Sequence, residues 1–132
     1  MALQYSTAVR DAKLDQIETT ISTAPVMRIL SGSAPANCAA AETGTIIATL
    51  TLPSDWMAAA SGGSKAKSGT WSDASADNAG TIGYFRIYDS GLTTCHIQGT
   101  AGTTGDLDTD TDTVTAGQTF TVNTFTITAG NA

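Results

Sequence analysis

The sequence predicts a mainly β fold: a β-sandwich or jelly roll of seven or eight antiparallel strands, preceded by an N-terminal α-helix. Three observations support this prediction. A chain of 132 residues suits one domain with a single core. Threonine and β-branched residues, which favour strands, are frequent, and Gly and Ser clusters provide turns between them. The apolar pattern changes from a helical period to a period of two after Pro25. We therefore expect a helical arm at 1–24 and a β-sandwich domain at 25–132.

The helix is predicted from the segment STAVRDAKLDQIETTI, which contains neither Gly nor Pro. Ser6 is a suitable N-cap, and Pro25 restricts the residue before it to extended geometry, which ends the helix. Leu14, Ile17 and Ile21 recur at helical spacing and form a narrow apolar stripe. This stripe packs either on the sandwich of its own subunit or on another chain, in a homo-oligomer or a larger assembly. For function, we interpret it as an oligomer or capsid contact.

The strands are predicted from alternation between apolar and polar residues. We expect them at VMRIL (26–30), TIIATLTL (45–52), GYFRIYD (83–89) and TCHIQGTA (94–101), with a short strand near Lys67 to Trp71. In GYFRIYD, alternation places Tyr84 and Arg86 on one face and Phe85 on the other. Trp56 and Met57, in SDWMAA, are expected to cap the core.

The last predicted strand, within 113–128, contains a change of phase. Phe120 and Val122 share one parity, whereas Phe125 and Ile127 share the opposite one. Because side chains alternate strictly in a regular strand, this change predicts a bulge or bend at Asn123-Thr124. Such a bend allows one strand to serve two sheets.

The charge pattern excludes several classes of function. The net charge is −6, the six basic residues are scattered, and none follows Arg86, so the sequence does not favour nucleic acid as a partner. No apolar run approaches the length of a membrane span. The first residues lack the pattern of a secretory signal, so we expect synthesis in a cytoplasm.

The stretch GDLDTDTDT places Asp106, Asp108, Asp110 and Asp112 at every second position. Two interpretations are open. In the first, three of these aspartates (Asp106, Asp108 and Asp110) begin a calcium loop, although a loop starting at Asp106 lacks the usual Gly at its sixth and Glu at its twelfth position. In the second, which the sequence favours, the carboxylates stand on the solvated face of an edge strand.

No catalytic constellation and no cofactor site is predicted. His96 is the only histidine, and its neighbour Cys95 is expected to point to the opposite face of the strand. Cys38 and Cys95 are either two free thiols or a disulfide, which would stabilise by roughly 3 to 4 kcal/mol in the chain-entropy model. Lys65 and Lys67 form a small basic cluster that is either solvated or in contact with an acidic partner.

Several phrases of the chain resemble small virion structural proteins of tailed bacteriophages. They are VMRILSGSAPANCAAAETGTIIATLTLPSDWMAAASGG, the later GTW and GYFRIYDS, then GTAGTTGDLDTD and the closing GQTFTVNTFTITAGNA. The resemblance covers almost the whole chain and rests on these stretches of sequence rather than on a catalytic motif. It carries over no catalytic residue.

The resemblance implies a decoration, or cement, protein on the capsid exterior. Such a protein would be made in the host cytoplasm and would bridge major capsid subunits as a homo-oligomer, a dimer or trimer. One alternative is a tail, fibre or baseplate component that binds a host glycan on an exposed aromatic platform, for which Trp56 or Trp71 would be candidates. Another is a calcium-dependent binding module.

Overall fold

The computed structural model describes residues 2–132 and contains one helix and ten strands. The prediction of a mainly β chain with an N-terminal helix is confirmed. The elements are α1 (Thr7–Ile21), β1 (Val26–Leu30), β2 (Ile46–Thr51), β3 (Ser64–Ala66), β4 (Ser72–Asp73), β5 (Gly80–Thr81), β6 (Tyr84–Tyr88), β7 (Cys95–Gly102), β8 (Leu107–Thr109), β9 (Thr113–Val114) and β10 (Phe120–Thr128). Within residues 2–132, no helix has the length and apolar character needed to cross a membrane.

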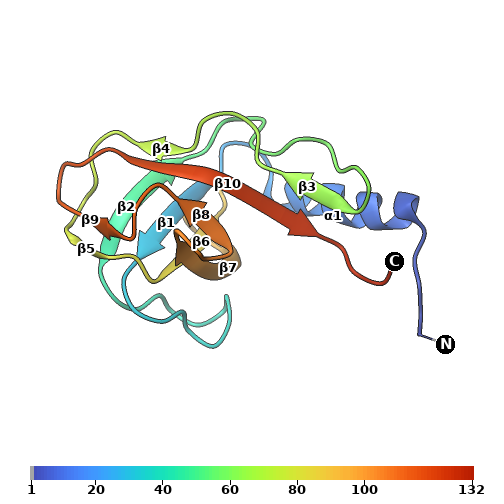
Figure 1. Ribbon diagram of the computed structural model, residues 1–132, viewed down its shortest axis with the longest axis horizontal. Helices are drawn as coiled ribbons and strands as arrows, with labels where there is room; N and C mark the ends of the chain where they lie inside the picture. Colours follow the sequence, from blue (N-terminus) through green and yellow to red (C-terminus); the bar gives the residue numbers. More distant parts are fainter. Residues whose placement is uncertain (1) are drawn as a thin grey trace.

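The strands form one curled sheet in the order β2-β1-β6-β7-β8-β10-β3, with β4 also paired to β10 and a separate small β5-β9 pair. The architecture is therefore a half-barrel, and the expected pair of stacked sheets is not seen (Figure 1). The expectation of purely antiparallel pairing is also wrong, because β7 and β8 run parallel. The connection between them, residues 103–106, is short, and the parallel pairing is limited to Ala101 with Leu107 and Gly102 with Asp108.

The core fills the inner face of this half-barrel. Four aromatic side chains lie in contact along it: the ring centroids of Trp56 and Trp71 are 6.0 Å apart, those of Trp71 and Phe125 are 5.7 Å apart, and those of Phe125 and Phe85 are 5.4 Å apart. Aromatic contacts at these separations add to the stabilisation from buried area. The prediction that Trp56 and Met57 cover the core is confirmed, since both are buried.

A loop, rather than a second sheet, covers the outer face of β1, β6 and β7. The loop comprises residues 31–45 and hangs below these strands in Figure 1. The buried Arg86 donates from Nη2 to the carbonyl oxygens of Asn37 and Ala40 at 3.1 and 2.8 Å. The Tyr84 hydroxyl donates to the Thr43 carbonyl and accepts from the Thr43 amide. The loop thus supplies hydrogen-bond acceptors to Arg86 and Tyr84 and covers the face on which a second sheet was expected.

The free edge of β2 is also covered. Asp73 accepts a hydrogen bond from the Thr49 amide at 3.0 Å, and Asp77 accepts one from the Thr49 hydroxyl at 2.8 Å. The β1–β2 register skips Ile47, whose carbonyl instead accepts from the Asp77 amide. The expected simple alternation in this strand is therefore interrupted by a bulge, and Ile47 and Ala48 are both buried.

The helix begins and ends close to the predicted positions. The Ser6 hydroxyl accepts from the Val9 amide at 3.3 Å, which confirms Ser6 as the N-cap. The helix ends at Ile21, because Ser22 adopts a positive φ of 75° while its amide donates to the Glu18 carbonyl.

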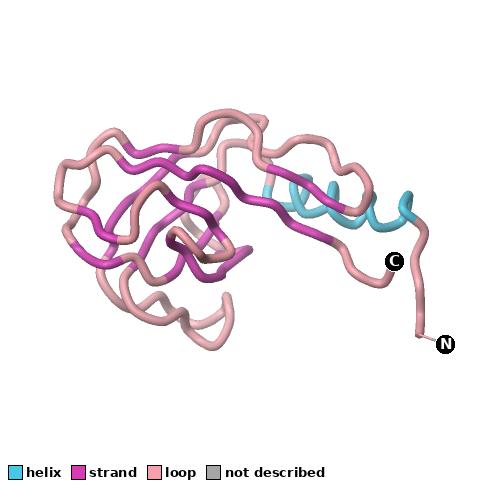
Figure 2. The backbone as a smooth tube through the Cα atoms, viewed as in Figure 1, coloured by secondary structure: helices cyan, strands magenta, loops and turns pink. Residues whose placement is uncertain are grey.

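The predicted irregularity in the last strand is confirmed. The β8–β10 register shifts between Val122 and Thr124, so Asn123 is the bulged residue. β10 pairs with β8 on one edge and with β4 and β3 on the other. Its C-terminal half leaves the half-barrel and runs beside α1 and β3, which forms an elongated helical end that also carries both chain termini (Figures 1 and 2).

Candidate functional site

A buried lysine attaches the helix to the elongated end of the sheet. Lys65, on β3, is 2% exposed, and its Nζ donates to Asp15 Oδ1 at 2.7 Å, to Glu18 Oε1 at 2.8 Å and to the Ala58 carbonyl at 2.8 Å. Burial alone would lower the pKa of Lys65, but the hydrogen bonds to the two carboxylates outweigh it and raise the pKa. The Lys65 hydrogen bond, aided by the Ala60 amide, lowers the pKa of Asp15.

The expected basic cluster of Lys65 and Lys67 is therefore absent as a surface. Lys65 faces inward to the helix carboxylates, whereas the Nζ of Lys67 donates to the Gly69 carbonyl. Lys65 and Lys67 are two residues apart, so strand alternation would place both side chains on the same face. Their environments differ because Asp15 and Glu18 of α1 lie next to Lys65. Further contacts hold the helix in place: Arg10 Nε donates to the Ala129 carbonyl at 3.0 Å, and the Gly63 amide donates to Asp11 Oδ1 at 2.7 Å.

These contacts orient the predicted apolar stripe toward the chain's own interior. Leu14 and Ile21 are buried, at 2% and 3% exposure. Ile17, midway between them, is half-buried and packs against the core from the side. Of the three residues predicted to contact another chain, the structure thus leaves Ile17 open to a partner, and the other two stabilise the chain itself.

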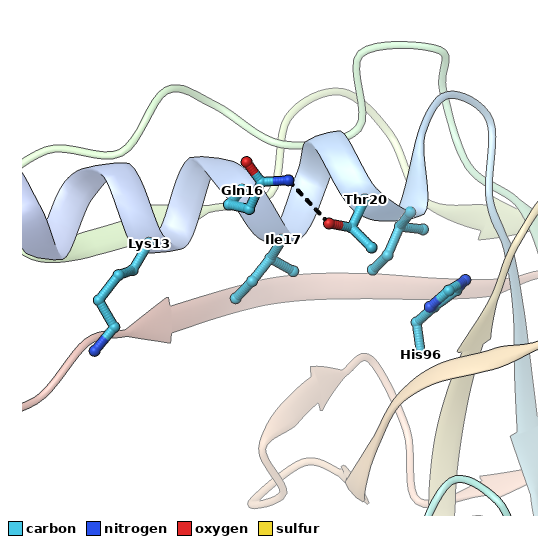
Figure 3. A pocket seen from close by; sticks show the side chains of 6 residues that line it. Lys13, Gln16, Ile17, Thr20 and His96 are labelled. Carbon is cyan, nitrogen blue, oxygen red and sulfur yellow. Dashed lines mark hydrogen bonds between the residues drawn. The ribbon is translucent and has the colours of Figure 1, made fainter.

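Ile17 lies at the centre of an apolar groove between α1, β7 and β10. Three adjoining hollows share this residue. One lies toward the C-terminal end of the helix beside Thr20 and His96, and in Figure 3 Ile17 points from the helix toward the β10 ribbon. A second lies toward Lys13 and the segment that follows β10. The third has a volume of about 350 Å³ and opens between β7 and β10.

The third hollow has an apolar floor. It is lined by Ile97 from β7, Ile127 from β10 and the two core rings Phe85 and Phe125. Gly99 belongs to the same lining, and a Cβ atom built there would lie 2.9 Å from the Phe85 ring and 2.9 Å from Asp106 Oδ2. Only glycine fits at this position, so the backbone of β7 approaches the floor closely. We call this surface, defined by Ile17 and the residues just named, the helical-end groove.

Comparison with known proteins adds no relative to this description. No protein family, curated protein or solved structure matches the chain.

The aspartates of the Asp-rich stretch do not converge on one point. Asp106 Oδ2 accepts from the amide and hydroxyl of Thr100, at 3.1 and 3.0 Å. Asp112 accepts from the amide and hydroxyl of Thr103, and these two hydrogen bonds lower its pKa. Asp108 accepts from a third threonine, on β10. Within residues 2–132, no three His, Cys, Asp or Glu side chains are placed to hold a metal ion.

Cys38 and Cys95, for which the sequence left both free thiols and a disulfide open, lie near each other as free thiols. Cys95 starts β7, and the residue opposite it, Tyr88, lies on the outer face of the sheet. The 31–45 loop brings Cys38 close enough to influence the pKa of Cys95, whose thiol donates to the Ile97 carbonyl at 3.5 Å. Burial, together with Cys38, raises the pKa of Cys95 to about 12, and both residues are free thiols here. The pair belongs to the cover of the outer face and lies away from the floor of the groove.

The remaining candidates have structural positions. Trp56 and Trp71 are fully buried, with their indole N–H groups donating to the carbonyls of Ser22 and Ser68, so neither forms the exposed platform expected for glycan binding. His96 is half-buried at one edge of the helical-end groove.

The sequence analysis did not single out the residues that line the groove on the sheet side. Ile97 and Ile127 were placed on strands, yet nothing in their alternation distinguishes a wall open to solvent from the closed core. Arg86 was also missed as a central residue of the outer face. A signal was present in its case, because an arginine between two tyrosines in a fully buried strand requires polar partners.

Proposed function

We propose that the chain is a structural subunit of a bacteriophage virion: a homo-oligomeric decoration protein that sits on the capsid exterior and bridges major capsid subunits. The helical-end groove is its subunit contact surface. The proposal takes the role from the sequence resemblance and assigns the subunit contact to this groove.

One observation carries the proposal: apolar side chains open to solvent are concentrated at one end of the molecule. The groove is lined by half-buried isoleucines, and Leu3 and Val9, at 69% and 44% exposure, lie at the same end. Contiguous exposed apolar surface commonly marks a contact with another protein. Bridging several copies at once would raise avidity without a single tight site.

The electrostatics are compatible with such a role. The net charge of −6 would give decorated particles an acidic exterior that keeps them apart in solution. The glycan-binding alternative has no support from the two tryptophans, because both are fully buried.

Co-sedimentation with virions purified from the source that encodes the chain tests the proposal. The wild-type protein should sediment with the particles, and Ile17→Arg should reduce the bound fraction by tenfold or more. A matched control is Leu92→Arg, which changes an exposed apolar residue of the β6–β7 turn that lies outside the groove. Failure of the wild-type protein to bind, and its absence from virions, would contradict the proposed function.

A further inference from the structure

The sheet splits where β8 is short, and the split leaves two strand edges facing each other. β8 pairs with β7 only at Ala101 and Gly102, and with β10 only over Val122–Phe125. Within the described residues, the stretch of β7 before Ala101 pairs with β6 alone. The C-terminal part of β10, Thr126–Thr128, pairs with β3 alone.

These two edges border the helical-end groove. Ile97, Gln98 and Gly99 line it from β7, and Thr126–Thr128 line it from β10. A strand that continued β8 in the direction of its start would lie between them. The chain instead turns away before Asp106, with the Gly105 amide donating to the Gly102 carbonyl. The groove is therefore a vacant strand position with an apolar floor.

The edge of β7 that faces the groove has no strand partner before Ala101. The Thr100 amide points away from β6, toward the groove, and donates to the Asp106 carboxylate at 3.1 Å. Because backbone groups alternate along a strand, the amide and carbonyl of Gln98 point the same way as those of Thr100. An unpaired edge beside an apolar floor is the surface that an added β-strand recognises.

The chain itself carries a segment that fits. Residues 2–5, ALQY, have no regular structure and lead into the helix cap Ser6. Leu3 is 69% exposed, the highest of the large exposed apolar residues, and Leu3 and Tyr5 alternate with small or polar neighbours. The segment is attached by the Tyr5 amide to the Asn131 carbonyl, by the Gln4 side chain to the Ala132 carbonyl, and by the Lys13 ammonium, which lies 4.4 Å from the centre of the Tyr5 ring. Residues 2–5 span about 13 Å when extended, the same length as Ile97–Thr100.

We infer that residues 2–5 of a second copy of this chain occupy the vacant strand position between β7 and β10, with Leu3 seated on the apolar floor. Because each copy has both a segment and a groove, two copies can exchange segments around a two-fold axis and satisfy both grooves at once. The inference deepens the proposed function, on which its biological role rests, by naming the partner that fills the groove.

Light scattering coupled to size-exclusion chromatography, with purified protein in the absence of virions, is the first test. The wild-type protein should be dimeric, and Leu3→Asp should weaken dimerisation about tenfold for each arm, as loss of a buried leucine implies. Gln4→Pro should have a similar effect, because it removes a backbone N–H from the added strand. Both changes lie in an exposed segment, so folding is retained. Leu92→Asp is the matched control and should leave the dimer intact.

Photo-cross-linking identifies the occupant. Leu3→p-benzoylphenylalanine, irradiated in a mixture of isotopically light and heavy protein, should give light–heavy cross-links that map to Ile97–Thr100 or Thr126–Thr128. A monomer at all concentrations, a dimer that survives both arm changes, or cross-links within one copy would each overturn the inference. A monomer that still co-sediments with virions would overturn the inference alone, and a dimer that does not co-sediment would overturn only the proposed function.

Discussion

Replacing Lys65 by methionine tests how firmly the helix is attached to the sheet. Methionine retains most of the apolar stem, so the change removes the charge and the three hydrogen bonds of Nζ. The carboxylates of Asp15 and Glu18, with side chains 50% and 25% exposed, can be rehydrated. The Ala58 carbonyl loses its side-chain donor, at a cost of about 1–3 kcal/mol.

Together with the loss of two partly solvated ion pairs of the Lys65 ammonium, we expect the free energy of unfolding to fall by about 2–4 kcal/mol. For a domain of this size, that loss lowers Tm by about 6–12 °C, measured by circular dichroism at 222 nm. Lys67→Met is the matched control, because Lys67 donates only to the Gly69 carbonyl and lies near the Trp71 ring. It should cost less than about 1 kcal/mol. Equal Tm values for wild type and Lys65→Met would refute this account of the helix attachment.

The pH dependence of stability gives a second readout of the same site. The pKa of Lys65 is raised above 10.5, so its contribution to stability is complete below pH 10.5 and is lost as the pH rises through the folded-state pKa. In the double variant Asp15→Asn/Glu18→Gln, burial remains without the carboxylates and lowers the Lys65 pKa. Stability should then increase as the pH rises toward 10.5. Urea titrations between pH 8 and pH 10.5 that gave the same trend for both proteins would contradict this reasoning.

Three further predictions concern other parts of the chain. Incubation with oxidised glutathione should join Cys38 and Cys95 by thiol–disulfide exchange and stabilise the protein by up to about 4 kcal/mol. Because the Cys95 pKa is raised to about 12, the reaction should be faster at pH 9 than at pH 7. An unchanged number of free thiols after prolonged incubation would contradict this prediction. Calcium and chelator should give the same melting curve, since Asp106 already accepts two hydrogen bonds from Thr100, and a rise in Tm with calcium would revive the calcium interpretation. Gly99→Ala should lower the free energy of unfolding by about 1–3 kcal/mol through contact with the Phe85 ring. Gly130→Ala is the control and should have almost no effect, because a Cβ there meets no atom within 4 Å. Equal stabilities of the two variants would contradict the close approach at Gly99.

The local elements were predictable because their signals lie within a few residues. The N-cap at Ser6, the strand at Val26–Leu30 and the bulge at Asn123 each follow from local spacing. The bulge is the clearest case, because the change in parity between Val122 and Phe125 requires an extra residue in the strand.

The arrangement of those elements was less predictable. The sequence suggested two stacked sheets, because a half-buried strand usually implies a second layer. Here the second layer is the 31–45 loop, whose carbonyls are bound by Arg86, and that role depends on contacts far apart in the sequence. Burial of Leu14 and Ile21 depends likewise on Lys65, whose partners on α1 cannot be identified from spacing alone.

The groove could not be predicted because it arises from a missing element. β8 covers only Leu107–Thr109. The part of β7 before Ala101 and the part of β10 after Phe125 therefore have no strand between them. Strand lengths are set by tertiary pairing as much as by local preference, and element boundaries are accordingly the weakest part of a prediction from sequence.

Hydrogen–deuterium exchange at the β7 edge tests most directly whether the helical-end groove is the contact surface. The amide of Gln98, which faces the groove, should exchange at least tenfold more slowly in the assembled protein than in the monomeric Leu3→Asp variant, because the added strand would supply its acceptor; the Thr100 amide already donates to Asp106. Equal exchange in both proteins, with protection on assembly appearing instead in the 31–45 loop or β2, would place the contact elsewhere and contradict the account.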